Sequence, residues 1–109
     1  MQFMLLVCCD RSFRPTAELE PETNAWVEEM DRRGVRKQGD RFRSINDAKT
    51  VMIRDGKAEI AAGPFEKTDF LVAGYDLLEC ANLDEAVAIA LKHPMAKWGK
   101  IEVRPIWSE

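Results

Sequence analysis

The stretch AAGPFEK, residues 61–67, divides the chain into two parts with different patterns. Residues 50–62 before it have the pattern of a β-hairpin, and Phe70 to Leu78 after it is the most apolar strand candidate of the second half. Gly63 can adopt backbone angles closed to other residues, and Pro64 fixes φ and cannot donate a ladder hydrogen bond. This pair is therefore expected to end the upstream strand sharply.

Length and composition are those of an ordinary globular domain. We expect a single domain over residues 1–109, because this length suffices for one core but not for two. The net charge of −3 argues against bulk attraction to nucleic acid or to an anionic membrane. No apolar run approaches the ~20 residues that span a bilayer, and the first nine residues resemble a strand more than a secretory signal. We therefore expect a cytoplasmic protein.

The cysteines offer little chemistry. Cys8 and Cys9 are adjacent, so in a strand they face opposite sides and are poorly placed to bridge each other. With one histidine in the chain there is no zinc spacing either. We expect Cys8, Cys9 and Cys80 to be small buried hydrophobes in a reducing compartment, and we expect neither a metal nor a cofactor.

Hydrophobic periodicity predicts the order strand, helix, hairpin, strand, helix, strand. The corresponding residues are 3–9, 21–33, 50–62, 70–78, 82–93 and 101–106, with a loop over 95–100. Asp55-Gly56 is a strong hairpin signal, and Asn82 with Glu85 forms a capping-box pattern at the start of the second helix. A glycine inside a strand, Gly74, suggests a bulge or a close approach by another backbone or a ligand. The buried stripe of the second helix is expected at Leu83, Ala86, Val87, Ala90 and Leu91.

This order predicts an α+β fold of the ferredoxin-like type, a split β-α-β sheet with two helices on one face. The other face of the sheet is then left uncovered. Residues 3–7 and 70–72 are apolar on both sides, and exposing a large apolar patch costs roughly 25 cal/mol per Å². We therefore expect the sheet to pack against a second copy as a homodimer. A monomer with a mixed outer face is the alternative.

A basic segment follows the first helix: Arg32, Arg33, Arg36, Lys37, Arg41 and Arg43. One interpretation is a site for an anionic ligand or phosphate group. The favoured interpretation is a solvated connection plus an edge strand protected by charge. Phe42 alone is too little aromatic surface for a nucleic-acid platform.

Several landmarks follow one another along the chain: Met4–Val7 with Asp10, TVMIRDGK at 50–57, AGPFEKT at 62–68, LDEA at 83–86, His93-Pro94 and IEVRPIW at 101–107. Together they resemble the YCII-related proteins, and specifically their DGPF-domain branch. Ala62 stands where the branch usually has aspartate. The N-terminal histidine that the YCII-like branch pairs with an aspartate is absent, so that acid/base pair is not transferred.

The resemblance implies a dimeric α/β barrel built from ferredoxin-like protomers. That superfamily includes small enzymes and small-molecule sensing modules, so the fold does not decide the function. Relatives are often associated with extracytoplasmic-function sigma factors, which suggests such a factor as a partner by resemblance only.

Two side chains are candidates for acid/base chemistry. His93 is the only side chain whose unperturbed pKa lies near neutrality, and the end of a helix favours its protonated form. Asp10 follows the first strand, a common place for a functional carboxylate. The alternatives are a histidine that closes its helix against Pro94 and an aspartate that opens a loop turn.

A second set is expected to bind a ligand: Gly63, Pro64, Phe65, Tyr75, Trp98 and Arg104. Phe65 and Trp98 are candidates for the wall of an apolar cavity, although aromatic side chains more often belong to a core or an interface. Arg104 and Glu102 lie on one face of the last strand and are expected to form a cross-strand or interfacial ion pair.

These observations lead to two functional hypotheses. The first is a small homodimer that binds a small organic molecule between the sheet and its loops, with weak acid/base chemistry by His93 and Asp10. The second is a non-catalytic regulatory or interaction module.

Overall fold

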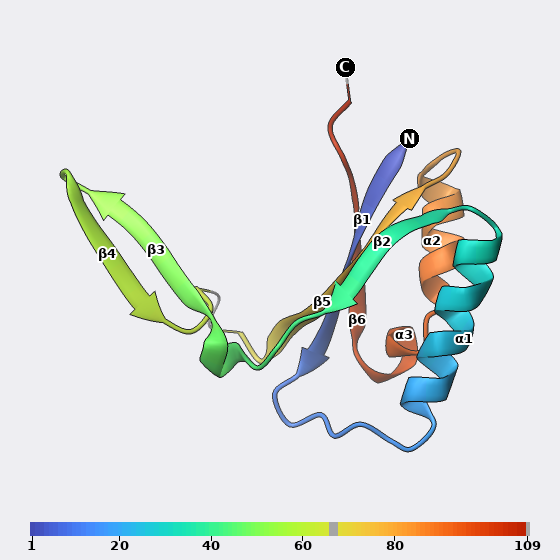
Figure 1. Ribbon diagram of the computed structural model, residues 1–109, viewed down its shortest axis with the longest axis horizontal. Coiled ribbons are helices and arrows are strands. Elements are labelled where there is room, and N and C mark those ends of the chain that lie inside the picture. Colours follow the sequence, from blue (N-terminus) through green and yellow to red (C-terminus); the bar gives the residue numbers. More distant parts are fainter. Residues whose placement is uncertain (66–67, 109) are drawn as a thin grey trace.

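The chain forms a body and a projecting arm, which the computed structural model describes over residues 1–65 and 68–108 (Figure 1). Its principal extents are 47 × 42 × 18 Å. In chain order the elements are β1 (Gln2–Asp10), α1 (Leu19–Arg32), β2 (Arg36–Arg41), the 3₁₀ turn η1 (Ile45–Asp47), β3 (Lys49–Arg54), β4 (Lys57–Ala62), β5 (Phe70–Glu79), α2 (Leu83–Leu91), α3 (Met95–Trp98) and β6 (Lys100–Pro105). No helix in the described ranges is long and apolar enough to cross a membrane.

The body has the predicted ferredoxin-like plan. Its sheet has the strand order β2-β5-β1-β6, and every neighbouring pair is antiparallel. Helices α1 and α2 make the two crossovers, from β1 to β2 and from β5 to β6, and both lie on the same face of the sheet (Figure 1). The predicted fold class is confirmed at the level of one chain.

The edge strand beside β5 comes from the basic segment, as the favoured interpretation of that segment expected. β2 pairs with β5 from Arg36 to Arg41 and has no partner on its other side among the described residues. The hairpin of β3 and β4 forms a separate two-stranded sheet, which we call the arm. It is thus an insertion between β2 and β5 and not part of the main sheet.

The core lies between the sheet and the two long helices. Phe3, Leu5 and Leu78 of the sheet are fully buried there. Trp26 and Met30 of α1 pack against them. Because side chains alternate along a strand, the same strands that bury Phe3 and Leu5 turn their other residues to the opposite face.

The prediction for the buried stripe of α2 is only partly right. Ala86 and Ala90 are buried as expected, together with Ile89, which was not included in the stripe. Leu83, Val87 and Leu91 are 44%, 40% and 72% exposed instead. Apolar residues surround most of this helix, and the small alanines are the ones that face the core, where they allow a close approach.

The local signals hold where the structure can test them. Asp55 and Gly56 both have positive φ, 52° and 76°, as a type I′ turn requires. Asn82 Oδ1 accepts a hydrogen bond from Glu85 N at 2.9 Å, which caps α2. The ladder between β1 and β5 shifts register opposite Gly74, so the bulge is confirmed. The loop expected over 95–100 contains the short helix α3.

The face of the sheet away from the helices, which we call the open face, is apolar in the middle and polar at its edges. The central pairs Met4–Leu77 and Leu6–Tyr75 form its apolar centre, and all four side chains are half-buried. Gln38 and Asp40 of β2 pair with Leu77 and Tyr75, and Arg104, Glu102 and Lys100 of β6 flank β1 on the other side. This open face has no second layer within the described chain.

A buried ion pair holds the edge strand β2 to the sheet. Arg36 Nε donates to Asp76 Oδ1 at 2.8 Å, and Asp76 is only 5% exposed. Arg36 also donates to the carbonyl oxygen of Gly39 and to the exposed carboxylate of Asp31. Burial raises the pKa of Asp76, while the hydrogen bond from Arg36 opposes that rise.

Replacing Asp76 by alanine should destabilise the fold by about 3 kcal/mol, because the largely buried guanidinium of Arg36 then keeps only an exposed carboxylate, that of Asp31, to balance its charge. Urea unfolding followed by circular dichroism measures this. Glu29→Ala, which removes the exposed pairs with Arg33 and Lys92, is the matched control and should cost less than about 1 kcal/mol. Equal losses in the two variants would contradict a special role for the Asp76 pair.

Candidate functional site

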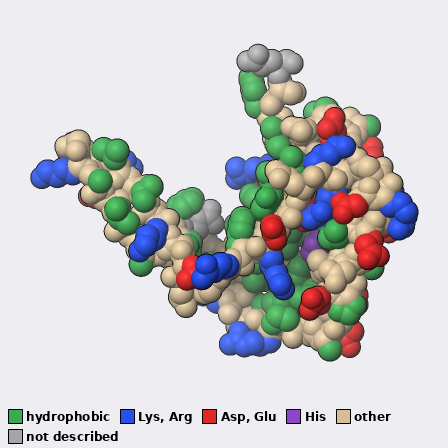
Figure 2. All heavy atoms as spheres, in the orientation of Figure 1, with side chains coloured by type: hydrophobic (Ala, Val, Ile, Leu, Met, Phe, Trp, Pro, Cys, Tyr) green, Lys and Arg blue, Asp and Glu red, His purple; other side chains and the backbone are tan. Residues whose placement is uncertain are grey.

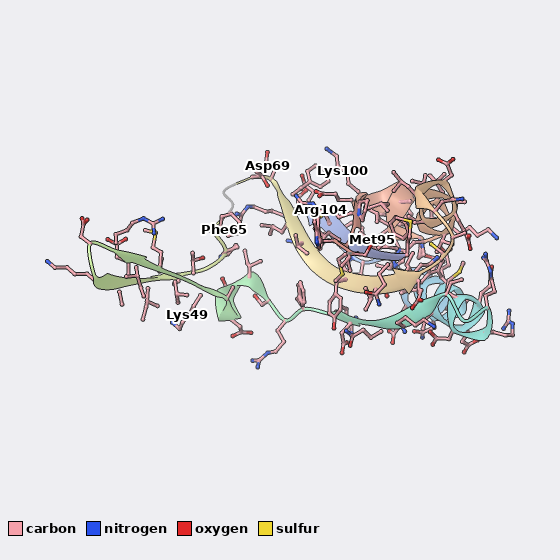
Figure 3. The ribbon with its side chains drawn as sticks, turned by 90° about the horizontal axis from the view of Figure 1, so that it is seen from above. Lys49, Phe65, Asp69, Met95, Lys100 and Arg104 are labelled. Carbon is pink, nitrogen blue, oxygen red and sulfur yellow. The ribbon has the colours of Figure 1, made fainter. Side chains whose placement is uncertain are left out.

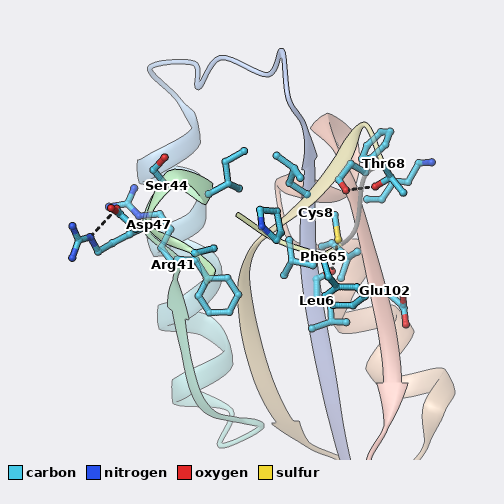
Figure 4. A pocket seen from close by; sticks show the side chains of 18 of the residues that line it. Leu6, Cys8, Arg41, Ser44, Asp47, Phe65, Thr68 and Glu102 are labelled. Carbon is cyan, nitrogen blue, oxygen red and sulfur yellow. Dashed lines mark hydrogen bonds and ion pairs between the residues drawn. The ribbon is translucent and has the colours of Figure 1, made fainter. Parts of the chain in front are cut away.

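A cleft of about 1050 Å³ lies where the arm joins the body, on the side of the open face (Figure 4). One wall is formed by β1, β5 and β6, and the other by the segment that leads from β2 into the arm. Its lining residues are Leu6, Cys8, Arg41, Phe42, Arg43, Ser44, Ile45, Asp47, Ala48, Pro64, Phe65, Thr68, Phe70, Leu71, Val72, Lys100, Ile101, Glu102 and Arg104.

The floor of the cleft is apolar because of strand alternation. Leu6 and Cys8 of β1 point away from the core, and Cys8 pairs with Val72 of β5. The bulge opposite Gly74 sets this register, which brings Val72 and Phe70 to the same side as Cys8. The floor therefore continues the apolar centre of the open face toward the arm.

The rim of the cleft carries more positive than negative charge. Arg43 forms an ion pair with Asp47, with Nε and Oδ2 3.3 Å apart, and Arg104 pairs with Glu102 of its own strand, β6. These pairs leave two cations. Within residues 1–65 and 68–108 the side chain of Arg41 makes no ion pair, and that of Lys100 lies over the Phe70 ring, with Nζ 4.2 Å from the centroid.

The base of the arm is fixed to the cleft by hydrogen bonds. Gly63 N donates to Ala48 O at 2.8 Å, and Thr50 Oγ1 donates to Gly63 O at 2.8 Å. Gly63 has a φ of 90°, which favours glycine at this position. The chain then turns so that Pro64 and Phe65 line the cleft, with Phe65 75% exposed.

The predicted ligand-binding residues only partly come together. Pro64, Phe65 and Arg104 line the cleft, and Gly63 lies at its margin. Tyr75 stacks on Phe42, a lining residue, with ring centroids 5.7 Å apart.

Trp98 lies elsewhere, at the end of α3. The Nζ of Lys97 lies 6.0 Å from the Trp98 ring centroid. The structure therefore does not bring Trp98 and Phe65 to one cavity among the described residues.

Asp10 lies at the end of β1 and makes the contacts of a loop turn. Its Oδ1 accepts hydrogen bonds from the backbone N of Ser12 at 2.7 Å and from the Ser12 hydroxyl. These bonds lower the pKa of Asp10. Asp10 does not line the cleft, so it is placed for opening the loop rather than for meeting a ligand there.

His93 lies on the helix side of the sheet and is only 5% exposed. Its Nδ1 accepts a hydrogen bond from Met95 N at 3.0 Å, and its ring meets the edge of Trp26 with centroids 4.6 Å apart. Burial lowers the pKa of His93 to about 4, so desolvation outweighs the expected effect of the helix end. His93 borders a separate hollow with Trp26 and Lys92, and Asp10 lies in neither place.

Some residues of the basic segment form ion pairs within the body, and others line the cleft. Arg36 is committed to Asp76, and Arg33 to Glu29 at 3.4 Å. Only Arg41 and Arg43 reach the cleft. Reasoning from the sequence missed Leu6, Cys8 and Lys100 as cleft residues, and it included Arg41 only in the less favoured interpretation of the basic segment as an anion site. Alternation along the first strand places Leu6 and Cys8 on one face, and that was the available signal.

Comparison with known proteins places this architecture in a family. The family model described as the YCII-related domain matches residues 1–109, so the chain belongs to the YCII-related family. It is also similar to a protein of Rhizobium meliloti (strain 1021) named "Uncharacterized protein R00369". The two are 31% identical over 104 residues, which cover 80% of this chain and 84% of the relative. Membership of the DGPF branch stays a prediction.

The burial of His93 makes stability depend on pH. Its pKa is about 4 in the folded state against about 6.5 when exposed, so the unfolded chain binds the proton more readily between these values. The contribution of the neutral His93 to the free energy of unfolding is therefore fully present above about pH 6.5. It is lost on acidification toward pH 4, and the loss amounts to about 3 kcal/mol.

Urea unfolding between pH 7 and 4.5 measures that loss, and NMR titration of the only histidine in the chain measures its pKa directly. His93→Asn keeps an acceptor for Met95 N and should flatten the dependence on pH. A histidine that titrates near 6.5 in the folded protein would contradict the assignment.

Proposed function

We propose that the protein is a homodimer that binds a small organic anion in the cleft at the base of the arm. The observation that carries this proposal is the pairing of an apolar floor, made by Leu6, Phe70 and Val72, with a rim that has two cations beyond its internal ion pairs. A ligand that suits this cleft has a hydrophobic part for the floor and a carboxylate or a similar group for Arg41 and Lys100.

The dimensions support a small molecule. Ligand sites usually measure about 300–1,000 Å³, and this cleft, at about 1050 Å³, is at the upper end because it is open to solvent. Its polar groups are few and lie around an apolar surface, which is the usual arrangement of such sites. The proposal contains no acid/base step, because neither His93 nor Asp10 lines the cleft.

The apolar centre of the open face is the observation that supports the homodimer in this proposal. Its centre of Met4, Leu6, Tyr75 and Leu77 is apolar and lies between polar edge strands, an arrangement that resembles the core and rim of a protein interface. Covering the open face with the same face of another copy removes both from water and gives a two-fold contact. The thiols of Cys9 and Cys80 suit a reducing compartment, so the cytoplasm is part of this proposal.

The cleft can be tested with 8-anilinonaphthalene-1-sulfonate, a fluorescent probe that is both aromatic and anionic. The double variant R41Q/K100Q should weaken its binding about tenfold, since two exposed charges at the rim of the cleft together contribute about 1.4 kcal/mol. R54Q/K57Q removes the same charge from the turn end of the arm, outside the cleft lining, and should bind the probe like the wild type. Equal affinity in all three proteins would refute the proposed site. Mass spectrometry of the natively purified protein identifies the physiological ligand.

The homodimer can be tested by sedimentation at micromolar concentration. The wild type should have twice the mass of one chain, and Leu77→Lys, which charges the apolar centre of the open face, should sediment as a monomer. Leu91→Lys adds the same charge to the exposed side of α2 and should leave the dimer intact. A wild-type protein that sediments as a monomer would remove the dimer from the proposal while leaving the cleft to its own test.

A further inference from the structure

The arm has one apolar face and one polar face. The pairs Val51–Ile60 and Ile53–Ala58 lie on the same side of the hairpin, and their side chains face away from the polar side. Val51, Ile53 and Ile60 are 70%, 69% and 67% exposed. The opposite side carries Thr50, Met52, Arg54, Lys57, Glu59 and Ala61.

This alternation is the pattern of a sheet that is buried on one side. Within its own chain, however, every residue of the arm from 51 to 62 is exposed (Figure 2). A two-stranded hairpin is at best marginally stable in water and needs a hydrophobic face covered by other elements. The arm therefore lacks the layer that its own sequence pattern requires.

The base of the arm sets its direction. The hydrogen bonds from Gly63 to Ala48 and from Thr50 to Gly63 fix the hairpin at the edge of the cleft. From there the arm extends away from the body on the side of the open face, where Figure 3 shows Phe65 near its base and Lys49 at the start of β3. A molecule that covers the open face thus lies next to the arm.

We infer that the apolar face of the arm, Val51, Ile53, Ala58 and Ile60, packs against a second copy of the chain. In the dimer the arm of each copy then contacts the other copy. This inference rests on the proposed homodimer and adds the arm to its interface. A two-fold contact presents each surface twice, so one arrangement covers both open faces and both arms.

Charge favours contact between the arm and the body of the other copy. The arm, residues 49–62, holds three lysines and arginines and two acidic residues, a net charge of +1. The whole chain carries −3, so the rest of it carries −4. Opposite charge steers the arm of one copy toward the body of another, whereas two arms repel each other.

The test compares the dissociation constant of the dimer in wild type and in the triple variant V51T/I53T/I60T, by sedimentation over a concentration series. Threonine keeps the β-propensity of the strands but removes apolar surface, so the dissociation constant should rise at least tenfold. The matched control M52T/A61S changes the polar side of the arm and should stay within twofold of the wild type.

Hydrogen exchange gives a second readout, which does not depend on how the threonine variant of the arm folds. The amides of β3 and β4 should be protected in the dimer and should exchange rapidly in the monomeric Leu77→Lys variant. A wild-type dimer whose arm exchanges freely, or one that the triple variant does not weaken, would overturn the inference about the arm and leave the homodimer standing. A wild type that is monomeric at every concentration would overturn both.

Cross-linking of lysines in a mixture of light and ¹⁵N-labelled chains locates the arm. Links between copies should join Lys57, next to the turn of the arm, to body lysines such as Lys92 or Lys100. Links between copies that join only Lys57 to Lys57 would show arm-to-arm pairing and would overturn the inference.

Discussion

The central strands β1 and β5 are apolar on both faces, while helices cover only one. Burial of Phe3, Leu5 and Leu78 against Trp26 and Met30 provides the core of the body. The same alternation turns Leu6 and Cys8 to the opposite face, where they form part of the floor of the cleft. The core, the open face and the candidate site are therefore three results of one pattern in two strands.

The edge strand β2 links this pattern to the rest of the molecule. Two of its three basic side chains serve different purposes, because Arg36 is held by Asp76 inside the protein and Arg41 reaches the cleft. The pairing of β2 with β5 thus places some residues of the basic segment inside the protein and others at the cleft. The positive charge that β2 contributes to the cleft therefore belongs to Arg41, which, unlike Arg36, does not hold β2 to the sheet through an ion pair within the described residues.

The sequence was sufficient to predict what depends on local chemistry. The positive φ angles that Asp55-Gly56 needs, the cap at Asn82 and the bulge at Gly74 are all set by residues close in the chain, and all were found. The order of elements then restricted the topology to the ferredoxin-like plan.

What the sequence could not predict depends on which surfaces meet. The exposure of Leu91 and the burial of Ile89 follow from the rotation of α2 on the sheet, which an almost uniformly apolar helix does not specify. The low pKa of His93 depends on Trp26, 67 residues earlier in the chain. The cleft was only partly predicted because its walls come from four strands and a turn that are distant in sequence.

The insertion of the arm between β2 and β5 has a consequence for variation in its length. The arm is joined to the body only at its base, through Ala48, Thr50 and Gly63, so residues can be added or removed at its turn without disturbing the main sheet. The pleat, however, repeats every two residues. A pair of residues added at the turn, one in each strand, therefore leaves every existing pair on its own side of the ribbon, and every second added pair lengthens the apolar side.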